Sequence, residues 1–152
     1  MFGQVHDHDR LGLLVAAAFL HDVGYAPALK ITGFHPLDGA MYLRRLHVDE
    51  RVVGLVANHT CANIEARLRD LDGRLAREFP KDEALPHDEL AFCDLTTGPS
   101  GEATSLDDRL RDIRLRYDPD DVVSRFIDQA EPEMRALIRR AEAVLAWSSA
   151  LV

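Results

Sequence analysis

Histidine and aspartate residues stand at the ends of several apolar segments of this sequence, and they are the side chains best suited to chemistry. A His-Asp pair follows the apolar run at residues 11–20, a His closely follows the run at 52–57, and an Asp follows residues 90–93. Another His ends a loop, directly before a Pro that suits the first turn of a helix. These residues are His21, Asp22, His35, His59 and Asp94.

Imidazole and carboxylate groups in apolar surroundings indicate a metal site. Burying an uncompensated carboxylate is costly, so buried acids are usually paired or bound to a metal. Together with imidazole they bind divalent transition metals and leave positions open for water. Adjacent residues lie about 100° apart around a helix. At a helix end, however, His21 and Asp22 can both turn toward one ion.

Each of these residues also has a purely structural interpretation, which the spacing leaves open. His59 could complement the dipole at a helix C-terminus, Asp94 could cap the turn that follows it, and His35 could cap a helix. His47 and His87 lie in polar, charged stretches, and we expect them on the surface.

Length and charge limit the classes of protein to consider. The chain has 152 residues and a formal net charge of −8, and this length suits a single domain over residues 1–152. The hydrophobic content of 47% argues against disorder. An acidic chain is a poor candidate for a nucleic-acid groove. The apolar run at 11–20 is about half of a membrane span.

The cysteines and the first residues predict a cytoplasmic protein. Cys61 and Cys93 show no CxxC spacing, which is typical of free thiols in a reducing compartment. Residues 1–10 are polar and acidic where a signal peptide would be basic and then apolar.

The hydrophobic spacing predicts an all-α fold, because no stretch alternates with a period of two. Residues 10–22 are apolar on nearly all sides, so we expect them to form a central buried helix. Asp49 and Ser105 are expected to cap helices. Further helices are expected after Asp49 and at 36–46, 62–75, 89–95, 106–117, 119–130 and 132–150.

Four strings in order resemble the signature of one family, the HD-domain superfamily of metal-dependent phosphohydrolases, in its HDIG-like form. They are AAFLHDVGY at 17–25, HPLDGA at 35–40, VANH at 56–59 and AFCDLTT at 91–97. The resemblance spans residues 11–98. The helices at 105–150 look like the C-terminal part of bacterial HD proteins but carry no signature. That superfamily is all-α, which agrees with the spacing.

The resemblance implies roles for individual residues. His21, Asp22 and Asp94 would be metal ligands, with His21 and Asp22 at the catalytic centre and Asp22 as a bridge between two metals. His35 and His59 would bind a second metal or the substrate phosphate. The implied cofactor is one or two divalent ions, of Mn, Fe, Co, Ni or Mg. The implied reaction is hydrolysis of a small phosphomonoester or phosphodiester, for which a nucleotide is a plausible substrate.

Lys30 is a further candidate for contact with the phosphate, as a point charge eight residues past the doublet. The alternative is a solvated loop lysine.

The sequence departs from the family pattern in three places. The superfamily's first His usually comes from a separate upstream helix, which we expect to be missing here. His6 or His8 could substitute for that His from a terminal segment. Asn58 precedes His59 where related sequences often have a second His, and no acidic general acid stands beside the doublet. The alternative function is therefore an impaired HD-fold binding or regulatory module.

The missing helix also has a consequence for assembly. Without that neighbour, the apolar helix ending at Leu20 would expose a patch, so a homodimer is possible.

Overall fold

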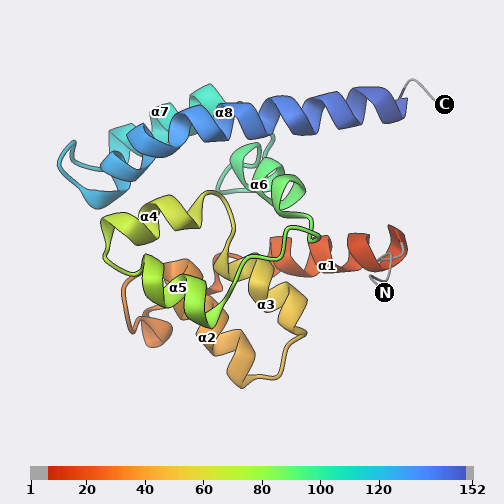
Figure 1. Ribbon diagram of the computed structural model, residues 1–152. Helices are drawn as coiled ribbons and strands as arrows, with labels where there is room; N and C mark the ends of the chain where they lie inside the picture. Colours follow the sequence, from red (N-terminus) through yellow and green to blue (C-terminus); the bar gives the residue numbers. More distant parts are fainter. Residues whose placement is uncertain (1–6, 150–152) are drawn as a thin grey trace.

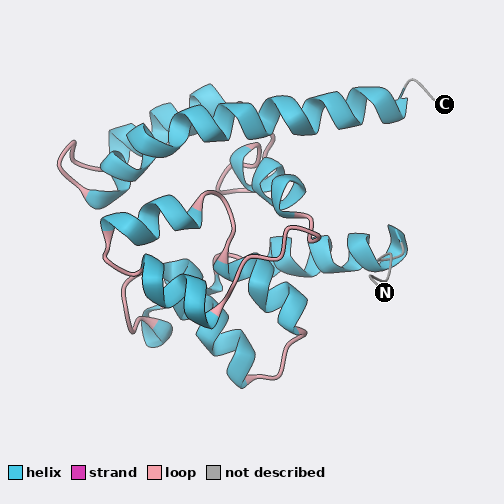
Figure 2. Ribbon diagram, viewed as in Figure 1, coloured by secondary structure: helices cyan, strands magenta, loops and turns pink. Residues whose placement is uncertain are grey.

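The computed structural model describes residues 7–149. In this part of the chain the regular structure is helical (Figures 1 and 2). The exception is one isolated β-bridge between Thr97 and Ala103. The all-α expectation is confirmed. The helices are α1 (Asp7–Leu20), α2 (His35–Arg45), α3 (Glu50–Ala57), α4 (Ala62–Leu68), α5 (Asp72–Glu78), α6 (His87–Leu95), α7 (Leu106–Arg116) and α8 (Val122–Ser149), with short 3-10 helices η1 (Val23–Tyr25) and η2 (Pro27–Leu29).

Helix α1 is buried on one side only, which corrects the expectation of a helix enclosed all round. Leu13 and Ala17 pack into the core against α3 and α6. Leu11, Val15 and Phe19 lie on the opposite face, and Phe19 is 87% exposed. Apolar composition alone does not show which faces of a helix have neighbours, and the described helices cover one face of α1.

Two glycines bring η1 against α2. A Cβ atom on Gly24 would lie 2.0 Å from the carbonyl oxygen of His35, and one on Gly39 would lie 3.1 Å from the amide nitrogen of Gly24. Only residues without a Cβ allow this approach. The contact explains the glycines of two of the four strings, because it brings the segment after Asp22 against the start of α2.

The buried residues form two clusters that meet at α6. The first cluster lies among α1 to α6 and includes Phe34, Leu37, Leu55, Val56 and Leu90. The second lies among α6, α7 and α8 and includes Leu95, Leu110, Ile127, Ala130 and Met134. Figure 1 shows α7 and α8 along one side of the molecule, with α6 between α8 and α1.

The division of the chain into helices differs from the sequence expectation in two places, besides shifts of a few residues at some helix ends. The expected helix at 62–75 is divided into α4 and α5, where Asp70 has a φ of 57° that interrupts the right-handed helix. The two helices expected at 119–130 and 132–150 are one continuous helix, α8, with Pro132 inside it. Ala130 and Met134 both pack in the second cluster, so tertiary contacts hold the chain helical on each side of the proline. The caps at Asp49 and Ser105 are confirmed.

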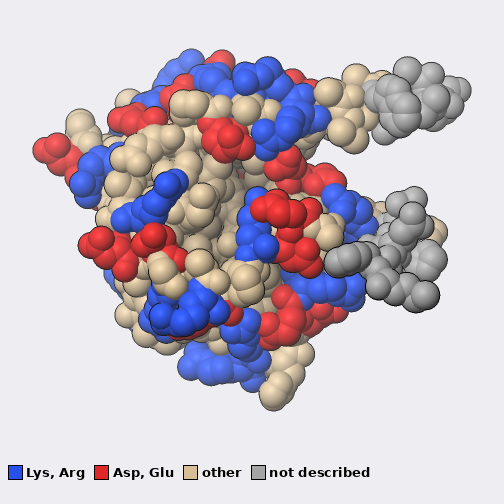
Figure 3. Space-filling model, in the orientation of Figure 1, with Lys and Arg blue, Asp and Glu red and all other residues tan. Residues whose placement is uncertain are grey.

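The surface carries charges of both signs. Figure 3 shows Lys and Arg side chains interspersed with Asp and Glu across the viewed face. Among the described residues, no helix has the length and apolar character needed to cross a membrane.

Candidate metal centre

The ends of four helices bring the five predicted residues together. His21 and Asp22 directly follow α1, His35 is the first residue of α2, and Asp94 lies in the last turn of α6. His59 lies two residues beyond α3 and is buried. The sites at which these helices begin and end therefore decide the geometry of the cluster.

The distances within the cluster are equal to, or a few tenths of an ångström above, those between ligands of one ion. The Nε2 atoms of His35 and His59 are 3.1 Å apart. His21 Nε2 lies 3.3 Å from Asp22 Oδ2 and 3.5 Å from Asp94 Oδ1, and His35 Nε2 lies 3.6 Å from Asp22 Oδ1. Ligand atoms about 2.1 Å from an ion, at tetrahedral or octahedral angles, are roughly 3.0–3.4 Å apart. One ligand atom from each of Asp22, His35 and His59 fits within a span of 4.8 Å.

Backbone hydrogen bonds orient two of the imidazoles. His21 Nδ1 is 2.8 Å from the carbonyl oxygen of Ala18, and His59 Nδ1 is 2.6 Å from that of Val56. A carbonyl oxygen only accepts, so each Nδ1 carries a proton and donates it. In the neutral ring the lone pair then lies on Nε2, which faces the cluster. This arrangement is typical of metal-binding histidines, so the donor set fits a divalent cation.

Burial and charge divide the cluster into two kinds of imidazole. Burial lowers the pKa of His21, but its contacts with Asp22 and Asp94 outweigh burial and raise the pKa to about 10. Burial is the main cause that lowers the pKa of His35, and the neighbouring His59 adds to it, so that this pKa falls to about 3. Burial also lowers the pKa of His59. His35 and His59 are therefore neutral near pH 7 and offer lone pairs.

The two carboxylates are held in their charged form. Burial raises the pKa of Asp94, but its contacts with His21 and Thr60 help to lower it well below its usual range. For Asp22, the contact with His21 likewise outweighs burial and lowers the pKa. Both groups are therefore available as anionic ligands at neutral pH.

One contact with the ring of His35 and one set of hydrogen bonds in the loop before it fix the position of this residue. The ring of Tyr25 stacks on it, with centroids 3.9 Å apart and planes 15° apart. Asp38, one turn into α2, is 1% exposed and accepts hydrogen bonds from the backbone of Ile31, Thr32 and Gly33. Asp38 thus fixes the loop that leads into α2, a role that the HPLDGA string did not reveal.

The cluster opens into a cavity of about 450 Å³ between the two hydrophobic clusters. Its polar walls include two residues that the sequence analysis missed. Thr60 donates a hydrogen bond from Oγ1 to Asp94 Oδ2 over 2.5 Å. Because it directly follows His59 in the sequence, it could have been predicted to lie near the cluster. Arg109 of α7 lies 3.9 Å from Asp94 Oδ1. It stands in an ordinary charged helix, so nothing in the sequence singled it out.

Other predicted residues lie away from the cluster. Lys30 is exposed and is not among the residues that line the cavity. His8 lies in the first turn of α1, about 18 Å along the helix from the end that precedes His21, and His6 lies outside the described residues. Asn58 donates to the carbonyl groups of Gly54 and Phe79.

The surface expectation for His47 and His87 is half right. His47 is exposed, but His87 is buried and its Nε2 contacts the carbonyl oxygen of Asp82. The polar residues around His87 predicted a surface position, but His87 is the first residue of α6.

A comparison with protein families bears on this cluster. The family model described as HD domain matches residues 4–130, which is most of the chain. The chain belongs to the HD domain family. The match covers all five clustered residues and extends through α7 into α8. No curated protein and no solved structure matched this HD domain in the corresponding searches.

Proposed function

We propose that the chain is a metal-dependent phosphohydrolase that cleaves a small phosphomonoester or phosphodiester, such as a nucleotide. The observation that carries this proposal is the convergence of His21, Asp22, His35, His59 and Asp94 at four helix ends, with ligand-like spacing. Membership of the HD domain family supports it.

In this proposal the ligands divide between two positions. His21, Asp22 and Asp94 hold one divalent cation, and His35 and His59 hold a second cation or contact the substrate phosphate. The two oxygens of Asp22 face different histidines, Oδ2 toward His21 and Oδ1 toward His35. This arrangement supports a bridging role for Asp22.

A divalent cation supplies Lewis-acid chemistry at such a site: it acidifies water and neutralises the charge that develops on a phosphoryl group. The residues of the chain do the positioning. The Nδ1 bonds of His21 and His59 keep their rings aimed inward, and the Thr60 hydroxyl holds one oxygen of Asp94.

The cavity supports a substrate with a ring-bearing leaving group. Its volume of about 450 Å³ falls in the range of small-molecule sites. One wall is apolar and aromatic, and is formed by Leu95, Ile113, Tyr117, Phe126 and Met134. A base or another flat ring can pack there while the phosphate lies at the cluster, which favours a nucleotide or an aryl phosphate.

Metal analysis of the purified chain, with assays of aryl phosphates and nucleotides in added Mn²⁺, tests the proposal. We expect bound metal and hydrolysis. Asp94→Asn should weaken metal binding by at least about tenfold, since even outer-shell changes cost 10–100-fold. The matched control is Asp88→Asn, on the same helix but paired with Arg140, and it should keep its metal.

Absence of bound metal together with absence of hydrolysis would refute the proposal. Metal retained without hydrolysis of any of these substrates would support instead a module that binds a phosphorylated ligand without turnover.

A further inference from the structure

Arg109 stands out among the arginines of α7 because its guanidinium has no close partner. Its Nη2 lies 3.9 Å from Asp94 Oδ1, which is beyond hydrogen-bond distance, and the group makes no other hydrogen bond or ion pair within residues 7–149. By contrast, Arg111, Arg114 and Arg116 each have a carboxylate oxygen within 3 Å. The side chain of Arg109 is only 20% exposed, so its five N–H donors are largely withdrawn from water and unused.

The position of Arg109 places those donors beside the metal cluster. It lines the cavity of about 450 Å³, and it also lines a smaller one of about 250 Å³ that likewise borders Asp94. Both cavities also border Asp22. A ligand atom that approached the cluster from either side would therefore come within reach of this guanidinium.

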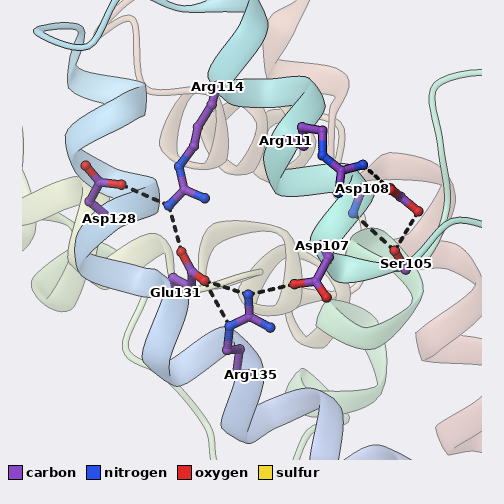
Figure 4. A network of polar contacts seen from close by, with 8 residues as sticks. All are labelled: Ser105, Asp107, Asp108, Arg111, Arg114, Asp128, Glu131 and Arg135. Atoms are coloured by element: carbon purple, nitrogen blue, oxygen red, sulfur yellow. Dashed lines mark hydrogen bonds and ion pairs between the residues drawn. The ribbon is translucent and has the colours of Figure 1, made fainter.

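Ion pairs hold helix α7 against α8, so the backbone from which Arg109 extends is fixed beside the cluster. Figure 4 shows ion pairs that join α7 to α8: Arg114 of α7 contacts Asp128 and Glu131, and Asp107 of α7 contacts Arg135. Within α8, Arg135 also contacts Glu131, which links these pairs. Linked pairs of this kind hold geometry better than isolated ones. Arg109 thus extends from a fixed backbone, and binding an anion there would require ordering of its side chain but no movement of the helix.

The charges around Arg109 indicate an anionic ligand. Without a cation, Arg109 faces the negative charge of Asp94. A divalent cation bound by Asp22 and Asp94 would balance their two charges, and Arg109 would then be left as an uncompensated, half-buried positive charge. A phosphate group on the open side of the cluster would satisfy that charge, and a guanidinium matches phosphate oxygens with two parallel donors.

We propose that Arg109 is a substrate-binding residue that donates hydrogen bonds to the non-bridging oxygens of the substrate phosphate. This proposal rests on the function proposed above. It assigns phosphate recognition to the C-terminal helices, which carry no signature, rather than to Lys30.

Calorimetric titration of the Mn²⁺-loaded full-length protein with inorganic phosphate, the reaction product, tests the role of Arg109. We expect Arg109→Gln to bind phosphate about tenfold to 100-fold more weakly, the range for a hydrogen bond to a charged group. Arg109→Lys, which keeps the charge but not the fork, should fall between wild type and Gln. The matched control is Arg111→Gln on the same helix, paired with Asp108 away from the cluster, and it should bind phosphate like wild type.

Metal content and thermal unfolding of each variant complete the test. Mn²⁺ content equal to that of wild type, together with weakened phosphate binding, would support the proposal. Wild-type phosphate affinity in Arg109→Gln would overturn it, and so would loss of Mn²⁺ in that variant, because Arg109 would then act by orienting Asp94. If the wild-type chain itself bound no Mn²⁺, the proposed function would fail first, which distinguishes the two failures.

Discussion

The buried carboxylate of Asp38 should be a highly sensitive position outside the metal cluster. Its Oδ2 accepts from the amides of Ile31 and Gly33 at 3.2 and 3.0 Å, and its Oδ1 accepts from the amide and the hydroxyl of Thr32 at 2.9 and 2.8 Å. In Asp38→Asn one oxygen becomes an amide group that only donates, so whichever oxygen remains, two donors lose their acceptor.

The magnitude follows from those two bonds. A hydrogen bond to a charged group contributes about 1.5–3 kcal/mol, and a buried donor without a partner costs a similar amount. Because such terms are not additive, we expect Asp38→Asn to lower the free energy of unfolding by about 3–5 kcal/mol. Domains of this size have roughly 5–15 kcal/mol in total, so the variant should fold but unfold at much lower urea concentration.

Urea unfolding followed by circular dichroism at 222 nm measures this loss. With a slope near 2 kcal/mol per M, the midpoint should fall by about 2 M while the slope stays constant. Asp49→Asn is the matched control, because Asn caps a helix as well as Asp does and Asp49 is an exposed cap of α3. A midpoint for Asp38→Asn within the error of that control would refute the reasoning.

Three further predictions concern packing, pH and assembly. Gly24→Ala should lower the free energy of unfolding by about 1–3 kcal/mol and weaken metal binding, because the new Cβ would clash with the carbonyl oxygen of His35. Gly12→Ala is the control, because a Cβ at that position would lie in open space. Equal losses of unfolding free energy in the two variants, measured in urea, would contradict the argument. Burial lowers the pKa of His87 below its unfolded value, so its contribution to stability is complete above about pH 6.5 and declines as the pH falls toward the folded pKa. In His87→Gln the dependence of unfolding free energy on pH between 5.5 and 7.5 should be shallower, by at most about 1.4 kcal/mol per pH unit; an unchanged slope would show that His87 is not the group involved. The open face of α1 predicts self-association that increases with protein concentration and is weakened in Phe19→Ser. If sizing chromatography shows the wild-type chain to be monomeric at every concentration, this self-association is excluded.

The sequence predicts a structural feature well when that feature depends on residues close together in the chain, and poorly when it depends on packing between distant segments. The candidate ligands are marked locally: four of the five residues lie at or close to the end of an apolar run, and His35 directly precedes a proline that suits the first turn of a helix. Arg109 is not local: its importance comes from the packing of α7 beside Asp94, and its neighbours in sequence are ordinary helix charges. The burial of α1 failed as a prediction for the same reason, since apolar residues specify an inward face only when a neighbouring element exists to cover it.

The position of the cluster between the two hydrophobic clusters has a mechanical consequence. Asp94 belongs to the helix that both clusters share, whereas His21, Asp22, His35 and His59 all extend from the first cluster alone. A cation held by both sets would act as a cross-link between α6 and the ends of α1, α2 and α3. The α6–α8 layer already packs on α1 and α4, and with a cation bound it would separate from the first cluster only after the cation was released. A bound cation would thus couple the unfolding of the two clusters more tightly.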